Sequence, residues 1–423
     1  MKLDDIDLGT MDLWEGPIEA RHEAFARLRA ERPIVFFEEP DPDSDLFERG
    51  PGFWSLTRHR DVVEASRRAE LFCSGQGTNI LDIPEELRDF IGSMINMDDP
   101  RHARLRRVVS KVFTPRSLEA LRSDVDAIAA EVVDEIAGKG ECDFVTDVAA
   151  LLPLRVIVDL MGIPRSQERF IFDQTNLLLG FLDPEYVPEA TPEAAVGAVL
   201  TAAQGLAGVV QELAEDRVRN PRNDLTTMLV NAEVDDDTIS PTELASFFIL
   251  LVGAGNETTR NAIAHGLVAL TQNPDQLALW QSDFERLAPT AVEEIVRWAS
   301  PVQHFRRTVT RDGVRLRDHE FSEGDKVVLW YWSGNRDEEV FDDPHRFDLG
   351  RTPNDHIGFG GPGPHFCLGA HLARREVSVM FRELLRRLPD IHAVGEPDRL
   401  RSGFINGIKH LPAAWTPVAA SRR

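Results

Sequence analysis

The residue with the most distinctive chemistry is Cys367, which lies in the segment FGGPGPHFCLG, residues 359–369. This segment contains four glycines and two prolines, and a helical pattern follows it. A thiolate at a helix start is stabilised by the helix dipole and by backbone N–H groups, which lowers its pKa. The glycines would let the backbone approach a flat, bulky group, and the prolines would fix the direction of the sulfur. The segment therefore predicts a thiolate that binds a metal in a large planar cofactor.

Two other interpretations of Cys367 follow from residue types alone. The first is an inert buried thiol. The second is a zinc site, because His365 and His371 lie close to the cysteine in sequence. A structural zinc ion takes four ligands, however, and two further ligands at metal spacing are missing.

A second segment that could do chemistry is AGNETT, residues 254–259, in a long apolar helical pattern. Its small residues leave room on the helix surface, and Thr258 shares a helix face with Leu251 and Phe247. From the residues alone, Thr258 could also bond the carbonyl group four residues before it, and Glu257 could be a solvated charge.

Charged residues form two further patterns. Glu294 and Arg297 are three residues apart, which on a helix surface would be an ion pair worth about 0.2–0.5 kcal/mol. The run RHARLRR, residues 101–107, is a basic helical pattern that could face water.

The elements that must position these residues are mostly helices. Apolar residues recur at helical spacing in residues 98–113, 117–140 and 147–164. The longest pattern covers residues 240–271 and starts with SPTE, which predicts a capping box at Ser240. Another helix ends at Pro301, and the last long helix covers about 367–388.

Short β-strands complete the expected fold. Strand patterns occur at 33–37, 53–57, 306–310, 314–316 and 326–332. We therefore expect a mainly α fold with a minor β part, in a single domain over residues 1–423. Its β-rich parts should lie near 30–60, 303–330 and 390–416, and its helical part at about 60–300 and 367–388.

Composition excludes several classes of function. The 423 residues include 47 basic and 71 acidic side chains, a net charge of −24, which disfavours nucleic acid and anionic membrane surfaces. The N-terminal segment lacks the apolar stretch of a signal peptide, and the most apolar run, residues 247–255, is too short to span a bilayer. Three widely spaced cysteines argue against a disulfide framework. These features predict a cytoplasmic protein with no membrane span.

Taken together, the segments resemble those of the cytochrome P450 monooxygenases. FGGPGPHFCLGAHLAR is similar to the haem-binding loop of that family, and AGNETT to the oxygen-activating segment of its long central helix. Glu294-Ile-Val-Arg297 resembles the family's ExxR pair, and FDDPHRFDLGR, residues 341–351, resembles the segment that adds a second arginine, here Arg346. His102-Ala-Arg-Leu-Arg106 resembles its propionate-binding helix. The resemblance covers nearly the whole chain.

One position departs from the common bacterial pattern. That pattern has Phe seven residues before the cysteine, where this chain has Gly360, and Phe359 stands one residue earlier. The resemblance is therefore to the group of actinobacterial hydroxylases of sterols and methyl-branched lipids, which shares this shift.

The resemblance implies a role for each motif residue. It implies haem b, with Cys367 as the axial ligand of the iron, and proton delivery to dioxygen through Thr258 and Glu257. The implied cofactor-binding residues are His102, Arg106, Ala254, Gly255, Arg307, Phe359, His365, Cys367 and Gly369. The implied substrate-binding residues are Ile95, Phe247, Leu251, Val302, Phe305 and Ile405. Glu294, Arg297 and Arg346 are expected to form a buried structural network.

The resemblance also implies a reaction and its partners. A haem-thiolate monooxygenase would use O2 and two electrons, from a ferredoxin and its reductase, to hydroxylate a hydrophobic branched lipid, isoprenoid or sterol-like chain. The alternatives are a monooxygenase of a terpenoid or polyketide and a peroxide-driven haem-thiolate enzyme. We expect a monomer, with a ferredoxin docking face at Arg101, Arg104, Arg107 and Lys111.

Overall fold

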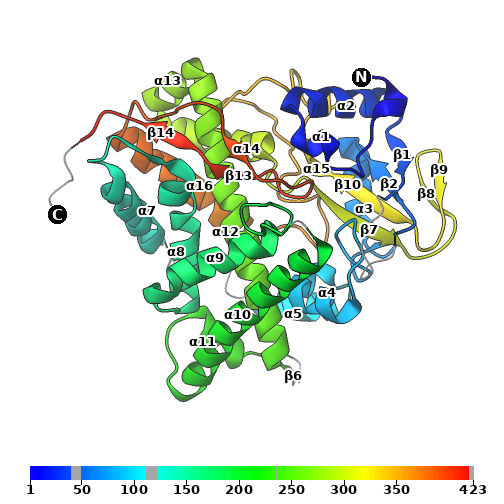
Figure 1. Ribbon diagram of the computed structural model, residues 1–423, viewed down its shortest axis with the longest axis horizontal. Coiled ribbons are helices and arrows are strands. Elements are labelled where there is room, and N and C mark those ends of the chain that lie inside the picture. The colour runs from blue at the N-terminus through cyan, green and yellow to red at the C-terminus, as the bar shows by residue number, and fades with distance from the viewer. Residues whose placement is uncertain (40–48, 111–121, 190, 235–236, 419–423) are drawn as a thin grey trace.

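The longest element is helix α12, Pro241–Gln272, which runs through the middle of the protein (Figure 1). The structure is a computed structural model that describes residues 1–39, 49–110, 122–189, 191–234 and 237–418. The predicted capping box is confirmed: the Ser240 hydroxyl accepts from the Glu243 N–H, and the Glu243 carboxylate accepts from the Ser240 N–H. This cap satisfies two backbone donors that an open helix end leaves without partners.

The other described helices are α1 (Asp12–Glu15), α2 (Ile18–Glu31), α3 (His59–Arg67), α4 (Glu85–Gly92), α5 (Arg101–Ser110), α7 (Arg122–Ile136), α8 (Leu151–Met161), α9 (Glu168–Leu179), α10 (Pro192–Arg219), α11 (Leu225–Val230), α13 (Pro274–Ser282), α14 (Phe284–Ala299), α15 (Tyr331–Gly334) and α16 (Ala370–Arg387). Short 3₁₀ or π turns are η1 (Leu3–Asp5), η2 (Ser93–Asn96), η3 (Val145–Ala149) and η4 (Arg165–Gln167). The strands are β1 (Ile34–Phe37), β2 (Phe53–Leu56), β3 (Phe72–Cys73), β4 (Glu141–Asp143), β5 (Glu233–Val234), β6 (Asp237–Thr238), β7 (His304–Val309), β8 (Val314–Leu316), β9 (His319–Phe321), β10 (Lys326–Trp330), β11 (His392–Ala393), β12 (Asp398–Arg399), β13 (Ile408–His410) and β14 (Pro412–Ala414).

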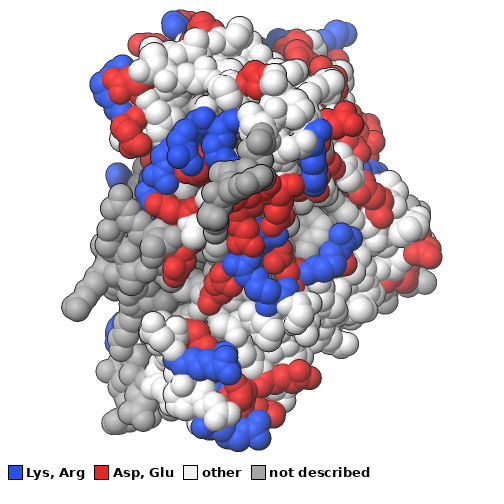
Figure 2. Space-filling model, turned by 90° about the vertical axis from the view of Figure 1, so that its left-hand side faces the viewer, with Lys and Arg blue, Asp and Glu red and all other residues white. Residues whose placement is uncertain are grey.

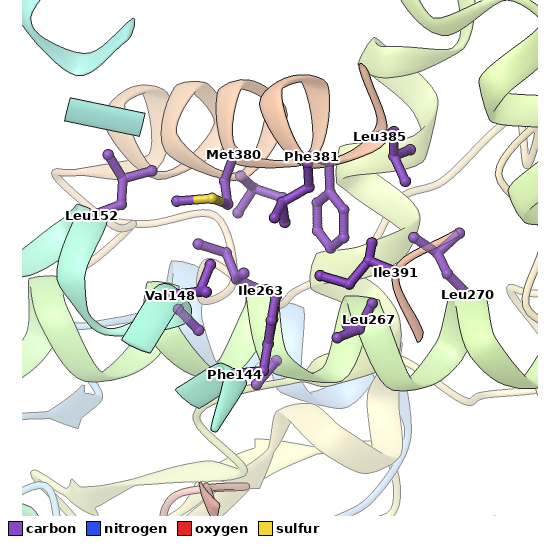
Figure 3. Packing of buried hydrophobic residues seen from close by; sticks show 14 of the residues in the cluster. Phe144, Val148, Leu152, Ile263, Leu267, Leu270, Met380, Phe381, Leu385 and Ile391 are labelled. Atoms are coloured by element: carbon purple, nitrogen blue, oxygen red, sulfur yellow. The ribbon is translucent and has the colours of Figure 1, made fainter. Parts of the chain in front are cut away.

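The main hydrophobic core lies between α12 and α16. Figure 3 shows Phe381 of α16 directed toward α12, near Leu267. The two helices approach closely because α12 has glycine at 266, where a Cβ atom would lie 2.7 Å from the Phe381 ring. Truncating such a buried phenylalanine to alanine typically costs about 3–5 kcal/mol.

The largest sheet has the strand order β1-β2-β10-β7-β3 and lies beside α1 and α2 (Figure 1). Its pairs are antiparallel, except that β2 and β10 are parallel. Successive side chains of β10 alternate between two cores: Val328 and Trp330 pack with α1 and α2, whereas Val327 and Leu329 pack on the other side. This strand is buried on both faces and holds β7 in place.

The prediction of a mainly α fold with a minor β part is confirmed. The strands expected at 33–37 and 53–57 are β1 and β2, and the central helix has the expected bounds within one residue. Helix α2, in the region before residue 60, was not predicted. The three cysteines Cys73, Cys142 and Cys367 are free.

Helix α10 has an unusual composition for a helix in the body of a protein. By length and hydropathy alone it could cross a membrane, and 28% of its most apolar window is buried. It packs against α9, α11 and α12. Helices that pack inside a protein pass the same composition test.

Candidate active site around Cys367

The loop before α16 places the sulfur of Cys367. The Cys367 N–H donates to the Phe359 carbonyl oxygen at 3.0 Å, which closes the loop at its two ends. Gly360 has a φ of +84°, which glycine adopts without strain, and its N–H donates to the Ile357 carbonyl oxygen at 3.0 Å. The Arg374 guanidinium lies 4.4 Å from the centre of the Phe359 ring. The loop shape therefore depends on bonds within the chain itself.

The glycines of this loop serve a different purpose from the one predicted. A Cβ atom at Gly361 would lie 2.5 Å from the Ser66 hydroxyl oxygen, and one at Gly363 would lie 2.3 Å from the Ser66 carbonyl oxygen. These two glycines therefore allow the loop to pack against α3. At Gly369, by contrast, a Cβ atom would meet nothing within 4 Å. Among the glycines of this loop, Gly369 alone has open space around its Cβ position in the described part of the chain, as close approach of a cofactor requires.

The prediction of a lowered thiol pKa at Cys367 is wrong for the polypeptide alone. Burial raises the pKa of Cys367, although the Gly369 N–H and the charges of Arg106 and Arg374 act in the opposite direction. Desolvation of the thiolate outweighs these contributions. A bound metal cation deprotonates a coordinating thiol outright, so a metal at Cys367 would supply the stabilisation of the thiolate that the polypeptide lacks.

Four cationic or imidazole side chains gather near the sulfur. The rings of His102 and His365 lie 4.3 Å apart between centres, and the Arg106 guanidinium donates to the Phe366 carbonyl oxygen at 2.5 Å. Burial, followed by the charges of Arg307, His102 and Arg106, lowers the pKa of His365 to about 2. The structure thus brings together all four residues expected to bind the propionates.

This group of side chains has free hydrogen-bonding capacity. Nε2 of His102 is buried and has no partner among the described residues, whereas Nε2 of His365 lies 3.1 Å from the Ser74 hydroxyl. Buried polar atoms without partners are rare, and each requires an explanation. A haem with two carboxylates beside these residues fits the unbonded nitrogen and the local excess of positive charge.

The central helix supplies the opposite side of the site. Ala254 is exposed in the middle of an otherwise buried stretch, which indicates open space at this position. The Thr258 hydroxyl donates to the Ala254 carbonyl oxygen at 2.6 Å, the bond that the sequence allowed for it. A Cβ atom at Gly255 would lie 2.8 Å from the Ile157 side chain, so Gly255 faces α8. The missing Cβ atom of Gly255 thus allows the close approach of α8 to α12.

Glu257 is a buried, paired carboxylate. Its side chain is 1% exposed, it forms an ion pair with Arg260, and it accepts from the Asn261 amide at 2.9 Å. Arg260 also donates to the Asn176 side chain of α9 at 2.8 Å. The interpretation of Glu257 as a solvated charge is therefore excluded. The position of the Glu257 carboxylate depends on its ion pair with Arg260.

The expected substrate-binding residues come from α12 itself, from η2, from β7 and the residues before it, and from the segment before β13. Phe247 and Leu251 lie on α12, Ile95 lies on η2, and Ile405 precedes β13. Val302 forms an isolated β-bridge with Ile405, and the Phe305 ring lies 5.4 Å from that of Phe404. Ile95, Leu251, Val302 and Phe305 are partly exposed, whereas Phe247 and Ile405 are buried.

The expected network around Glu294 exists, with one correction. Glu294 and Arg297 are both fully buried, with 2.7 Å between Oε2 and Nε. The second arginine is Arg351, whose Nε donates to Glu294 Oε2 at 3.1 Å. Arg346 contributes only its carbonyl oxygen, which accepts from Arg297 and Arg351, and its side chain is exposed. The turn that joins Asp343 to Arg346 directs the Arg346 side chain away from the carboxylate.

The basic residues proposed for ferredoxin docking are partly paired with acidic residues. Arg101 lies 3.3 Å from Asp89, and Arg104 lies 2.7 Å from Glu243. Lys111 lies outside the described residues. Figure 2 shows basic and acidic side chains intermixed on the side of the molecule that carries α7 and α8.

Comparison with known proteins decides the family. The sequence model of the cytochrome P450 family matches residues 85–406. The chain belongs to the cytochrome P450 family. This P450 is 49% identical to a methyl-branched lipid omega-hydroxylase of Mycobacterium tuberculosis, over 97% of this chain and 95% of the relative. It is 41% identical to a steroid C26-monooxygenase of Rhodococcus jostii, over 92% of this chain and 81% of the relative.

A solved structure agrees with the fold of the P450. The structure of a Mycobacterium marinum cytochrome P450 in complex with pseudoionone superposes with a TM-score of 0.91, at 41% identity, over 98% of this chain and 99% of that one. The P450 is therefore an oxidoreductase, and its family implies a haem iron with a thiolate ligand. Cys367, the unbonded His102 nitrogen and the open space at Ala254 and Gly369 fit that group.

Two further positions of the site, Arg351 and Arg260, have recognisable signals in the sequence. Arg351 ends the segment FDDPHRFDLGR that contains Arg346. Arg260 follows Glu257 by three residues, a helical ion-pair spacing.

Proposed function

We propose that this P450 hydroxylates an aliphatic chain of a branched lipid, isoprenoid or sterol-like substrate. The observation that carries the proposal is its 49% identity to a methyl-branched lipid omega-hydroxylase over nearly the full length of both chains. The apolar character of the expected lining supports it, because burial of apolar surface is the main source of affinity for such a substrate. Phe247, Leu251, Val302, Phe305 and Ile405 carry no charge.

The cofactor that suits this site is haem b. Cys367 would hold the iron, and His102, Arg106, Arg307 and His365 would hold the two propionates. Haem bound in this way supplies the activation of dioxygen.

The chain itself would supply protons and orientation. The Thr258 hydroxyl stands beside the open space at Ala254, where it can hold a proton near the reacting oxygen. Glu257 is next to it in sequence and buried, and its pairing with Arg260 keeps it in a defined position. The apolar side chains exclude water, which limits the loss of protons and electrons to side reactions.

Electrons would come from a ferredoxin and its reductase, and we propose a cytoplasmic monomer. A peroxide-driven enzyme would not need a proton relay, so the retained Glu257 and Thr258 favour the monooxygenase.

A second candidate substrate class is a terpenoid. The Mycobacterium marinum P450 that superposes with this chain was solved with pseudoionone, which makes an isoprenoid substrate worth testing beside the lipids. A polyketide remains a third class for the same assay.

The test has two parts. Reduced protein with carbon monoxide should show the long-wavelength absorption of a thiolate-ligated haem, and Cys367→His should lose that band. Branched fatty acids, cholestenone and isoprenoids should then be titrated against the ferric protein, with the shift of the haem band as the signal. Binding at micromolar concentration, about −8 kcal/mol, by a branched chain supports the proposal. If a compact polar molecule binds and none of these does, the lipid assignment is wrong.

A further inference from the structure

Two surface segments meet beside the expected substrate site. The first is the loop of residues 180–189, between α9 and α10, and the second is the hairpin of β12 and β13 (Figure 1). Helix α9 packs on α12, where Leu178 and Leu179 lie 3.5 and 3.8 Å from the Cβ position of Gly253. The hairpin carries Ile405, which pairs with Val302. The loop thus continues from a helix that packs on α12, and the hairpin itself carries one of the expected substrate-binding residues.

A buried carboxylate anchors the loop to the hairpin. Asp183 is 1% exposed, and its oxygens accept from the Arg401 N–H at 2.9 Å, the Glu185 N–H at 3.0 Å and the Lys409 ammonium at 3.2 Å. Arg401 also donates through its guanidinium to the Leu182 carbonyl oxygen at 3.1 Å. Removing one partner from a buried charge pair is strongly unfavourable, so Lys409 is central to this contact.

Lys409 and its neighbour His410 extend the contact to further carboxylates. The Lys409 ammonium lies 2.9 Å from Glu185 and 3.6 Å from Asp398 of β12. The two ring nitrogens of His410 face Asp143 of β4 and Glu185, the latter at 2.9 Å. His410 therefore bridges the loop and β4, while Lys409 joins the loop to β12.

Acidic groups outnumber basic groups in this cluster. The carboxylates of Asp183, Glu185 and Asp398 lie around the ammonium of Lys409. Asp143 and Glu185 face His410, so a proton on His410 supplies a second positive charge. Glu185, Asp398 and His410 also lie close enough together to share a metal ion, but the Lys409 ammonium already contacts both carboxylates. The cluster is therefore understood as an ion-pair network.

We propose that Lys409 and His410 are positioning residues that fasten loop 180–189 to the β12–β13 hairpin and so keep the substrate side of this P450 closed. The proposal rests on the proposed function only for the statement that the substrate binds beside this loop and hairpin. The fastening itself follows from the contacts of Asp183 and Glu185.

The fastening should depend on pH. Burial acts to lower the pKa of His410, but its hydrogen bonds to Asp143 and Glu185 outweigh this, and the pKa is raised. Burial likewise acts to raise the pKa of Glu185, but Lys409 and His410 outweigh this, and the pKa is lowered. The His410 contribution is complete below the pKa of a free histidine, about 6.5, and is lost as the pH rises through the raised pKa. The Glu185 contribution is present above the pKa of a free glutamate, about 4.3, and is lost as the pH falls through the lowered pKa.

The first test needs no substrate. Loop 180–189 contains Phe181 and Tyr186, which chymotrypsin can cut when the loop opens. In the haem-loaded protein, Lys409→Gln should speed cleavage in this loop by about 10- to 100-fold, as expected when a carboxylate loses a hydrogen bond to a charged group. Lys409→Arg should restore most of the protection. Lys139→Gln, at an exposed lysine on another turn, is the matched control and should cleave like the parent protein.

The second test measures how fast a small ligand enters and leaves the haem site. Imidazole binds haem iron and gives a band shift, so its entry and exit rates can be followed by stopped flow without knowledge of the substrate. Lys409→Gln should increase both rates. In the parent protein the exit rate, which does not depend on the protonation of free imidazole, should increase as the pH rises from 6 to 9. His410→Gln should remove this pH dependence.

The outcomes separate the two proposals. Unchanged cleavage and unchanged imidazole exchange in Lys409→Gln, with a melting temperature equal to that of the parent, would overturn the fastening. Cleavage that increases at many sites beyond this loop would also overturn it, because Lys409 would then stabilise the fold in general. Failure of every lipid to bind would contradict the proposed substrate class and leave the fastening results unaffected.

Discussion

The clearest prediction from the structure concerns which arginine supports Glu294. Glu294 accepts from Arg297, from Arg351 at 3.1 Å and from the Asp348 N–H at 3.0 Å, and it has no exposure to solvent. Arg351→Gln removes one charged donor but leaves Arg297 in place. A hydrogen bond to a charged group contributes about 1.5–3 kcal/mol. Arg346→Gln changes an exposed side chain, and such a substitution usually changes the free energy of unfolding by less than about 0.5 kcal/mol.

These energies convert into melting temperatures. The entropy of unfolding is about 2.1 cal/mol/K per residue, or roughly 0.9 kcal/mol/K for this chain. Arg351→Gln should therefore lower the melting temperature by about 2–3 °C, and Arg346→Gln by about 0.5 °C or less. Arg297→Ala, which leaves a buried carboxylate short of its main partner, should cost about 3–5 kcal/mol and lower it by about 3–6 °C.

The assay is thermal unfolding of the haem-loaded protein, followed by circular dichroism at several heating rates. Equal shifts in Arg346→Gln and Arg351→Gln would refute the assignment of Arg351, and a larger shift in Arg346→Gln would restore the sequence-based prediction. Unchanged stability in Arg297→Ala would refute the buried network as a whole.

Three further predictions follow from the site. Thr258→Ala should divert electrons to hydrogen peroxide, because a well-placed proton donor contributes about 10²–10⁴-fold; Thr201→Ala, which loses the same kind of helix bond on α10, should leave the ratio of product to NADH unchanged. Glu257→Gln and Arg260→Gln should each lower stability by about 3–5 kcal/mol, and a double variant as unstable as the sum of both, measured by melting, would contradict their pairing. Burial raises the pKa of Glu376 to about 8 despite a hydrogen bond with Thr259, so the folded protein retains a proton there that the unfolded chain has lost. The contribution of Glu376 to stability should therefore fall as the pH rises from 5 to 8, and the melting temperature of the parent relative to Glu376→Gln should decrease over this range.

The sequence was most informative where local rules decide the structure. The capping box at Ser240, the long helix after it and the alternating strands depend on neighbours in the chain, and these predictions are confirmed. The order of the motifs was sufficient to identify the family, because several weak signals at the right spacing exclude most other folds.

The sequence-based predictions are wrong where the structure depends on segments that are far apart in the chain. Gly361 and Gly363 are explained by Ser66 of α3, which is almost 300 residues earlier. The choice between Arg346 and Arg351 depends on the backbone path through one turn. Neither periodicity nor composition contains this information.

The loop around Cys367 has a practical consequence. Its shape is fixed by the bond from the Cys367 N–H to Phe359 and by close packing of Gly361 and Gly363 on α3, and none of these contacts involves the porphyrin. A preformed binding loop loses little conformational entropy when its ligand enters. The apoprotein should thus accept manganese or cobalt porphyrins without remodelling, which would make this P450 a suitable scaffold for artificial metalloenzymes.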